Sequence, residues 1–186
     1  MEKPLPSLVG FSEKNHQWFA EGISLAKLAH DFSTPLYVYS KEAICSAYRA
    51  YDAACIRPNG TRRARIHYAM KANSNLAVLD ELKQLGAGFD LVSGGELARA
   101  LQIGADPKSL VFAGVGKSSA EIENALRAGV KCINVESISE LQRVNAIAKT
   151  LGLRAPISLR VNPDVDANTH PYISTGLKDN KFGIAF

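Results

Sequence analysis

The chain has 186 residues, of which 46% are hydrophobic and 22% are charged. This composition suits one folded domain with a hydrophobic core, and it excludes a chain that is disordered as a whole. The net charge is only +4, and the lysines and arginines are scattered apart from one dense patch at residues 62–65. We interpret that patch as a solvated loop and not as a nucleic-acid-binding arm.

Two further features bear on where the protein works. No stretch of about 18 consecutive apolar residues occurs, and the first residues lack the apolar centre of a signal peptide. We therefore expect a soluble protein with no membrane span and no cleaved signal. The cysteines Cys45, Cys55 and Cys132 are odd in number and show no C-x-x-C spacing, which favours reduced thiols in the cytoplasm.

The pattern divides the chain into an N-terminal segment at residues 1–40 and a main domain at residues 41–186. Within the segment, apolar residues at positions 23–29 predict a short helix. Residues 34–39 (TPLYVY) then predict the start of a strand, because β-forming residues alternate after a proline. A helix is expected to follow from Lys41 to about Cys55.

Strand and helix patterns alternate through the rest of the chain at a repeat of about 22 residues. Apolar segments of strand length occupy residues 66–70, 89–92, 110–113, 132–135 and 157–161. Helical patterns lie between them, at residues 76–85, 96–101, 119–128 and 140–151. This alternation predicts consecutive βα units that form a parallel sheet.

The predicted helices carry capping signals at their ends. A serine stands three residues before a glutamate at the start of the last three helices, in the pairs Ser93 and Glu96, Ser118 and Glu121, and Ser137 and Glu140. Glycines follow the four apolar stripes, at Gly86, Gly104, Gly129 and Gly152. The connections are therefore short, which favours a (β/α)8 TIM barrel over a doubly wound sheet.

The sequence does not contain a whole barrel. A complete (β/α)8 barrel needs roughly 250 residues, whereas this chain shows about five βα units and stops within the pattern at residues 181–186. We expect an incomplete α/β barrel of the TIM type, whose open sheet edges would need cover. On this interpretation the chain is either a fragment or is closed by another polypeptide.

Lys71 is the main catalytic candidate. Residues 66–70 (IHYAM) alternate as a strand does, so Lys71 falls at the carboxyl end of that strand, on the face shared by His67 and Ala69. Ligands bind at this edge in α/β sheets and barrels, and residues 73–75 (NSN) offer a cap for the next helix. A desolvated lysine is the form that makes a Schiff base. The alternative is a lysine that extends into solvent at a strand end.

Asp90 and Arg160 are the next candidates. Asp90 lies inside the second predicted strand, where a buried carboxylate needs a cationic partner, and Arg160 in the fifth strand is the candidate for that partner. Residues 93–95 open the following helix with N–H groups that could face an anion, although ordinary capping explains them equally well.

Two loops carry residues that are typical of other chemistry. Residues 112–118 (FAGVGKS) look like a phosphate-binding loop, but Val111 stands where a P-loop needs glycine, which excludes nucleotide hydrolysis there. His170 follows the fifth strand in a polar loop and is a candidate active-site residue, although a lone loop histidine is usually only a surface residue. Neither metal-ligand spacing nor a nucleophile elbow occurs in the sequence, so no metal site is expected.

Several motifs, taken together, resemble the alanine-racemase-like (fold type III) pyridoxal-phosphate decarboxylases. They are residues 34–39 (TPLYVY), 68–73 (YAMKAN), 89–96 (FDLVSGGE), 160–164 (RVNPD), 170–176 (HPYISTG) and 181–183 (KFG). The second is similar to the cofactor-lysine motif of that family, and the last three are similar to the diaminopimelate decarboxylases in particular. The resemblance runs from about residue 17 to the end of the sequence.

The resemblance implies a cofactor and a reaction. Lys71 would hold pyridoxal 5′-phosphate until an amino-acid substrate displaces it, and Asp90 and Arg160 would form the polar floor beneath the cofactor. The implied reaction is decarboxylation of meso-diaminopimelate to L-lysine in lysine biosynthesis. Enzymes of this family are homodimers in the cytoplasm, and the resemblance implies neither a nucleic-acid partner nor a membrane partner.

The sequence also departs from the family. It lacks the later strands, the histidine that stacks on the cofactor ring, the glycine-rich phosphate loops, the acidic partner of the pyridine nitrogen, the C-terminal β-domain and the cysteine segment donated by a second subunit. We therefore expect little or no decarboxylase activity from this polypeptide alone.

Three alternatives stay open at this point. The same scaffold fits an ornithine, arginine or carboxynorspermidine decarboxylase, because the residues that select the side chain would lie beyond residue 186. The chain could instead be a non-catalytic pyridoxal-phosphate-binding or regulatory relative. It could also be a truncated product with no function of its own, which would unfold with poor cooperativity.

Overall fold

The computed structural model describes residues 8–162 and 183–185. The chain divides into two compact units, one formed by Met1–Arg65 with Gln84–Gly86 and the other by Ile66–Lys83 with Ala87–Phe186. No helix among the described residues is both long and apolar enough to cross a membrane. The larger unit contains the five repeat strands that the sequence predicts.

The smaller unit contains a β-meander and two helices. Strands Phe11–Lys14 (β1), Gln17–Ala20 (β2) and Ile23–Ser24 (β3) pair antiparallel in that order, and the helices are Leu25–Phe32 (α1) and Lys41–Ala54 (α2). Asn15 and His16 form the turn between β1 and β2, with φ of 50° and 60°. The apolar pattern predicts both helices but misses the meander, because its strands are only two to four residues long.

The strand predicted at residues 34–39 is not formed. These residues pair with no strand in the part of the chain that the structure describes, and Tyr37 and Tyr39 are exposed. Helix α2 begins directly after them, where the Ser40 hydroxyl accepts a hydrogen bond from the Ala43 amide at 3.0 Å. A β-forming sequence with no neighbouring strand has no ladder to join, so the alternation alone does not make a strand here.

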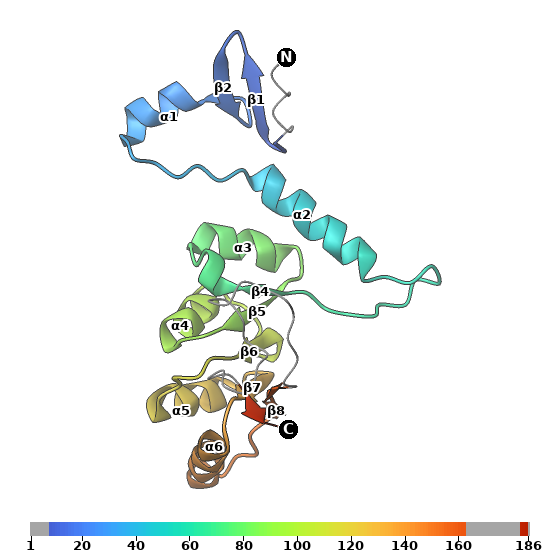
Figure 1. Cartoon of the computed structure of the whole chain (residues 1–186), viewed down its shortest axis with the longest axis vertical. Coiled ribbons are helices and arrows are strands. Elements are labelled where there is room, and N and C mark those ends of the chain that lie inside the picture. The colour runs from blue at the N-terminus through green and yellow to red at the C-terminus, as the bar shows by residue number, and fades with distance from the viewer. Residues whose placement is uncertain (1–7, 163–182, 186) are drawn as a thin grey trace. The chain divides into compact units, whose positions relative to one another are not determined.

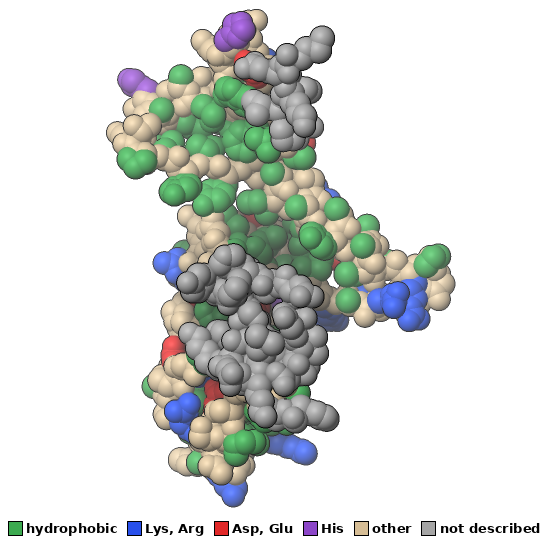
Figure 2. All heavy atoms as spheres, viewed as in Figure 1, with side chains coloured by type: hydrophobic (Ala, Val, Ile, Leu, Met, Phe, Trp, Pro, Cys, Tyr) green, Lys and Arg blue, Asp and Glu red, His purple; other side chains and the backbone are tan. Residues whose placement is uncertain are grey.

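The basic patch lies on the loop that follows α2. Residues 62–65 are exposed, and Figure 2 shows Lys and Arg side chains gathered at the tip of this loop. Arg62 also binds Asp52 of α2, with 2.7 Å between Nη1 and Oδ1. The prediction of a solvated loop is therefore confirmed.

The larger unit contains a parallel sheet whose strand order follows the chain (Figure 1). The strands are His67–Ala69 (β4), Gly88–Leu91 (β5), Leu110–Phe112 (β6), Cys132–Val135 (β7) and Ile157–Leu159 (β8). The helices are Leu76–Gln84 (α3), Gly94–Gln102 (α4), Ser119–Ala128 (α5) and Ile138–Thr150 (α6). Short 3₁₀ turns lie at Met70–Ala72 and Pro107–Ser109, and Val161–Asn162 (β9) pairs in parallel with Ile184–Ala185 (β10). A strand order without reversal is that of a partial α/β barrel, as predicted.

Alternation along the strands gives the sheet one apolar and one polar face. Figure 1 shows helices α4, α5 and α6 along one side of the strands. The strand side chains that are completely buried are Phe89, Leu91, Leu110, Phe112, Ile133 and Val135. Residues between them in sequence, such as Asp90 and Asn134, point to the opposite face and keep partial exposure. Polar groups are thereby collected on the side of the sheet away from the apolar core.

The helix ends follow the capping signals with one difference. In α4, α5 and α6 the hydroxyl of the capping serine accepts a hydrogen bond from the amide of the glutamate three residues later. Glu121 completes the reciprocal bond to the amide of its own cap residue. Glu96 and Glu140 reach one residue further and accept hydrogen bonds from the amides of Val92 and Glu136. The four helix-ending glycines all have positive φ, as their positions predict.

Gly88 is the position in β5 where a side chain does not fit. A Cβ there would lie 2.5 Å from the Ser109 carbonyl oxygen and 2.6 Å from Nδ1 of His67. We predict that Gly88→Ala lowers the free energy of unfolding, measured in urea, by about 1–3 kcal/mol through overpacking. Gly95→Ala is the control, because its Cβ would meet nothing nearer than 3.8 Å. Equal losses in the two variants would contradict the steric explanation.

Candidate active site

Lys71 lies at the carboxyl edge of the parallel sheet. Strand β4 ends at Ala69, and the 3₁₀ turn Met70–Ala72 follows it. Met70 is completely buried and anchors this turn, whereas Lys71 is exposed. The position at a strand end agrees with the sequence, and of the two alternatives left open for this side chain the described structure shows the one that extends into solvent. The strand ends before Lys71, and no segment among the described residues covers the side chain.

Hydrogen bonds fix the chain on both sides of Lys71. The Tyr68 hydroxyl donates to the Asn73 carbonyl oxygen at 3.2 Å. Oδ1 of Asn73 accepts from the Asn75 amide, and Oδ1 of Asn75 accepts from the Ala77 amide, both at 2.9 Å. Asn75 therefore caps α3, as residues 73–75 predict, and the turn that carries Lys71 is held between β4 and this cap.

Asp90 lies beside this turn on the neighbouring strand. Ala69 of β4 and Asp90 of β5 are register partners, so Asp90 points from the polar face at the same edge of the sheet. Burial raises the pKa of the Asp90 carboxyl above its ordinary value, while the positive charges of Lys71 and His67 act in the opposite direction. The structure therefore brings Lys71 and Asp90 within electrostatic reach of each other.

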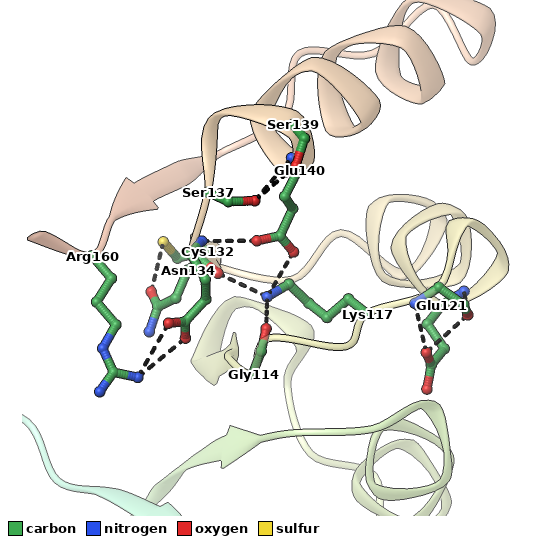
Figure 3. Close-up of polar contacts among 11 residues, drawn as sticks. Gly114, Lys117, Glu121, Cys132, Asn134, Ser137, Ser139, Glu140 and Arg160 are labelled. Carbon is green, nitrogen blue, oxygen red and sulfur yellow. Dashed lines mark hydrogen bonds and ion pairs between the residues drawn. The ribbon is translucent and has the colours of Figure 1, made fainter. Parts of the chain in front are cut away.

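Arg160 follows β8 directly, and its guanidinium contacts Glu136. Its Nη1 lies 3.2 Å from both carboxylate oxygens of Glu136 (Figure 3). The predicted pairing of Arg160 with Asp90 is not found. Arg160 pairs with Glu136 instead, and the charges that act on Asp90 are those of Lys71 and His67. The strand order explains the difference: Glu136 follows β7, which is paired with β8, whereas two strands separate β8 from the strand of Asp90.

Lys117, Glu136 and Glu140 form a buried charged cluster that sequence reasoning misses. Figure 3 shows the contact between Lys117 and Glu140. Lys117 lies in the loop between β6 and α5, with its Nζ 2.9 Å from Oε1 of Glu140 in α6. Two features of the sequence could have indicated this cluster. Lys117 is the one charged residue in residues 112–118, and Glu140 is a helix-capping glutamate. Because the Lys117 ammonium group bonds inside the protein, it does not point outward toward a ligand.

His67 begins β4, at the opposite end of the strand from Lys71. Its Nε2 lies 3.4 Å from Nζ of Lys131. Burial, and after it the charge of Lys131, lower the pKa of the His67 imidazole below its ordinary value. We therefore assign His67 to the interior of the sheet and not to the reactive edge.

The remaining candidate, His170, lies outside the described residues. Within residues 8–162 and 183–185, no group of three or more His, Cys, Asp or Glu side chains lies close enough to hold a metal ion. The described edge therefore offers an exposed amine, Lys71, next to the Asp90 carboxyl, whose burial favours the protonated form. Such an arrangement can bind and react with a carbonyl compound.

Comparison with known proteins identifies the larger part of the chain. Residues 42–186 match the family described as "Pyridoxal-dependent decarboxylase, pyridoxal binding domain". The chain is 56% identical to the diaminopimelate decarboxylase of Pseudomonas aeruginosa over 94% of its own length and 41% of that protein. It thus spans well under half of the length of the curated relatives it matches.

Solved structures agree with the family match. The diaminopimelate decarboxylase of M. jannaschii, solved in complex with L-lysine, is 43% identical with a TM-score of 0.85, over 94% of this chain and 41% of that one. The lysine/ornithine decarboxylase of Vibrio vulnificus, solved with cadaverine, is 26% identical with a TM-score of 0.61, over 73% and 35% of the two chains. These similarities confirm the fold that the sequence motifs imply.

The lowered pKa of His67 predicts how stability changes with pH. The unfolded chain binds a proton at His67 near pH 6.5, whereas the folded protein binds it only at lower pH, so stability falls as the pH drops below 6.5. We predict that the unfolding free energy falls between about pH 7.5 and about pH 5.5. The fall should be smaller in His67→Gln, and unchanged in the control His30→Gln, which alters an exposed ring. An identical fall in both variants would contradict this assignment.

Proposed function

We propose that this chain, which belongs to the pyridoxal-dependent decarboxylase family, binds pyridoxal 5′-phosphate through Lys71 and forms part of a diaminopimelate decarboxylase. The reaction would remove CO2 from meso-diaminopimelate to give L-lysine, a step of lysine biosynthesis. The observation that carries the proposal is Lys71 at the carboxyl edge of β4 with Asp90 beside it, within the domain that matches the pyridoxal binding family.

The described residues fit this cofactor. A primary amine is the group that can form a covalent link to the aldehyde of pyridoxal phosphate, and Lys71 is exposed and can be reached. Asp90 places an ionisable carboxyl beside it on the same face of the sheet. When bound, the cofactor supplies an electron sink for the bond to the departing carboxylate.

The chain's own residues would then orient the reactants. The fixed turn between β4 and α3 would hold the amine of Lys71 at the sheet edge, within reach of a bound cofactor. Asp90 can hold a proton at its carboxyl group, since burial favours the protonated form. Arg160, held by the Glu136 carboxylate, adds a polar group at the same edge of the sheet.

An ornithine-type decarboxylase is the second candidate. Support for diaminopimelate comes from the identity of 43% to the M. jannaschii enzyme against 26% to the lysine/ornithine decarboxylase of Vibrio vulnificus. The homodimer, the cytoplasmic location and the weak activity of this polypeptide by itself stay predictions from the resemblance.

Cofactor binding by Lys71 is directly testable. We predict that adding pyridoxal phosphate to the chain produces the visible absorption band of a lysine-linked cofactor, and that Lys71→Ala abolishes this band because the amine is lost. Lys149→Ala is the matched control, since Lys149 is an exposed lysine in the last turn of α6. Equal bands in Lys71→Ala and in the unaltered chain would contradict the assignment of Lys71.

The substrate class can be tested in the same way on a longer chain that extends past residue 186, where the residues that select the side chain are expected. An amino acid that displaces Lys71 from the cofactor changes the absorption band, so binding can be followed even where turnover is weak. We predict that meso-diaminopimelate changes the band at a concentration at least about tenfold lower than L-ornithine does, a difference of about 1.4 kcal/mol. The reverse order would favour the ornithine-type alternative.

A further inference from the structure

We infer that the buried ion pair between Lys117 and Glu140 positions Arg160 at the carboxyl edge of the sheet. Lys117 and Glu140 are then positioning residues for the proposed cofactor site. Three interactions link these residues. Lys117 forms an ion pair with Glu140 (Figure 3), and Glu140 accepts a hydrogen bond from the backbone amide of Glu136. The Glu136 carboxylate in turn forms an ion pair with Arg160. The inference rests on the proposed function for its catalytic meaning, but its structural part can be tested without the cofactor.

Lys117 is a fixed point of this edge. Its side chain is completely buried, and its ammonium group donates to the Gly114 carbonyl oxygen at 2.5 Å and to the Asn134 carbonyl oxygen at 2.8 Å. The third contact is with Glu140 Oε1 at 2.9 Å. Two hydrogen bonds and one ion pair therefore tie the loop after β6 to β7 and to α6.

The Glu140 carboxylate contacts both the Lys117 ammonium group and the neighbouring backbone. Its Oε1 contacts Lys117, and its Oε2 accepts a hydrogen bond from the Glu136 amide at 2.8 Å. The bond bypasses the cap residue Ser137, unlike the reciprocal bond made by Glu121 in α5. The capping glutamate of α6 therefore holds the residue at the exit of β7 in place.

The carboxylate of Glu136 contacts Arg160, so the fixed backbone of Glu136 also restrains the Arg160 guanidinium. Its side chain is 3% exposed, and both of its oxygens contact Nη1 of Arg160 at 3.2 Å. Arg160 itself is 43% exposed, so its guanidinium reaches from a buried anchor toward the open face. A long side chain tethered in this way loses much of its rotational freedom, and a site gains precision when its supporting contacts are rigid.

The energetics favour a positioning role over simple stabilisation. Burying both charges of the Lys117–Glu140 pair is unfavourable, and apolar side chains of similar size often stabilise a fold as well or better. The exposed pair of Arg127 and Glu123 in α5, with side chains 62% and 43% exposed, carries no such desolvation penalty. It is the natural control for removing one ion pair from the same unit.

The test removes both charges together, because Lys117→Met alone would leave Glu140 buried and unpaired. In the double variant Lys117→Met/Glu140→Met, we expect the Glu136 amide to exchange with deuterium roughly tenfold faster, since it loses a hydrogen bond to a charged acceptor. We also expect the Nε–H resonance of Arg160 to move. The control double variant Arg127→Met/Glu123→Met should change neither. Should the first variant fail to fold, Glu140→Gln serves in its place, with a smaller change of the same sign.

A cofactor titration tests the catalytic meaning. The Lys117→Met/Glu140→Met variant should raise the apparent Kd for pyridoxal phosphate by roughly three- to tenfold, and by less than about twofold when Arg160→Ala is already present, because the effect passes through Arg160. Equal effects in both backgrounds, or an unchanged Glu136 exchange rate, would overturn the inference. If the unaltered chain does not bind pyridoxal phosphate, the proposed function fails, whereas the exchange rate and the Arg160 resonance still decide the positioning contact.

Discussion

The alternation of side chains along the parallel strands is the constraint on which the rest of the larger unit depends. Every second residue of β5, β6 and β7 is apolar and completely buried, and burial of this face is what holds strand and helix together. The intervening residues must then point to the opposite face. Asp90 and Asn134 are polar for this reason, and the parallel direction of all five strands brings their carboxyl ends to one edge.

Charges at that edge are arranged in neighbouring pairs. The charge of Lys71, in the turn after β4, acts on Asp90 in the adjacent strand β5, Lys117 binds Glu140, and Glu136 binds Arg160. The pairs differ in exposure, which separates their roles. The Lys117–Glu140 pair is buried and fixes the backbone, whereas Lys71, in the turn after β4, and Arg160, directly after β8, have exposed side chains.

The sequence predicts the regular parts of this structure well, because they follow from local rules. Strand β7 and helix α5 match the predicted ranges, and the serine caps and glycine ends are found where the motifs place them. Local rules fail where a distant partner decides the outcome. Residues 34–39 alternate as a strand does but find no neighbour to pair with in the described part of the chain. The partner of Arg160 is set by strand order, which residue type alone does not reveal, and the exposure of Lys71 depends on what covers the edge.

The most direct test of Lys71 as the cofactor-binding residue is chemical trapping of pyridoxal phosphate. The chain would be incubated with pyridoxal phosphate, reduced with borohydride and digested, and the modified peptides would be identified by mass spectrometry. We predict selective modification of Lys71 over the other exposed lysines, because among the described lysines only Lys71 combines the family motif with a fixed position beside Asp90. Labelling spread evenly over surface lysines, with Lys71 not preferred, would contradict it.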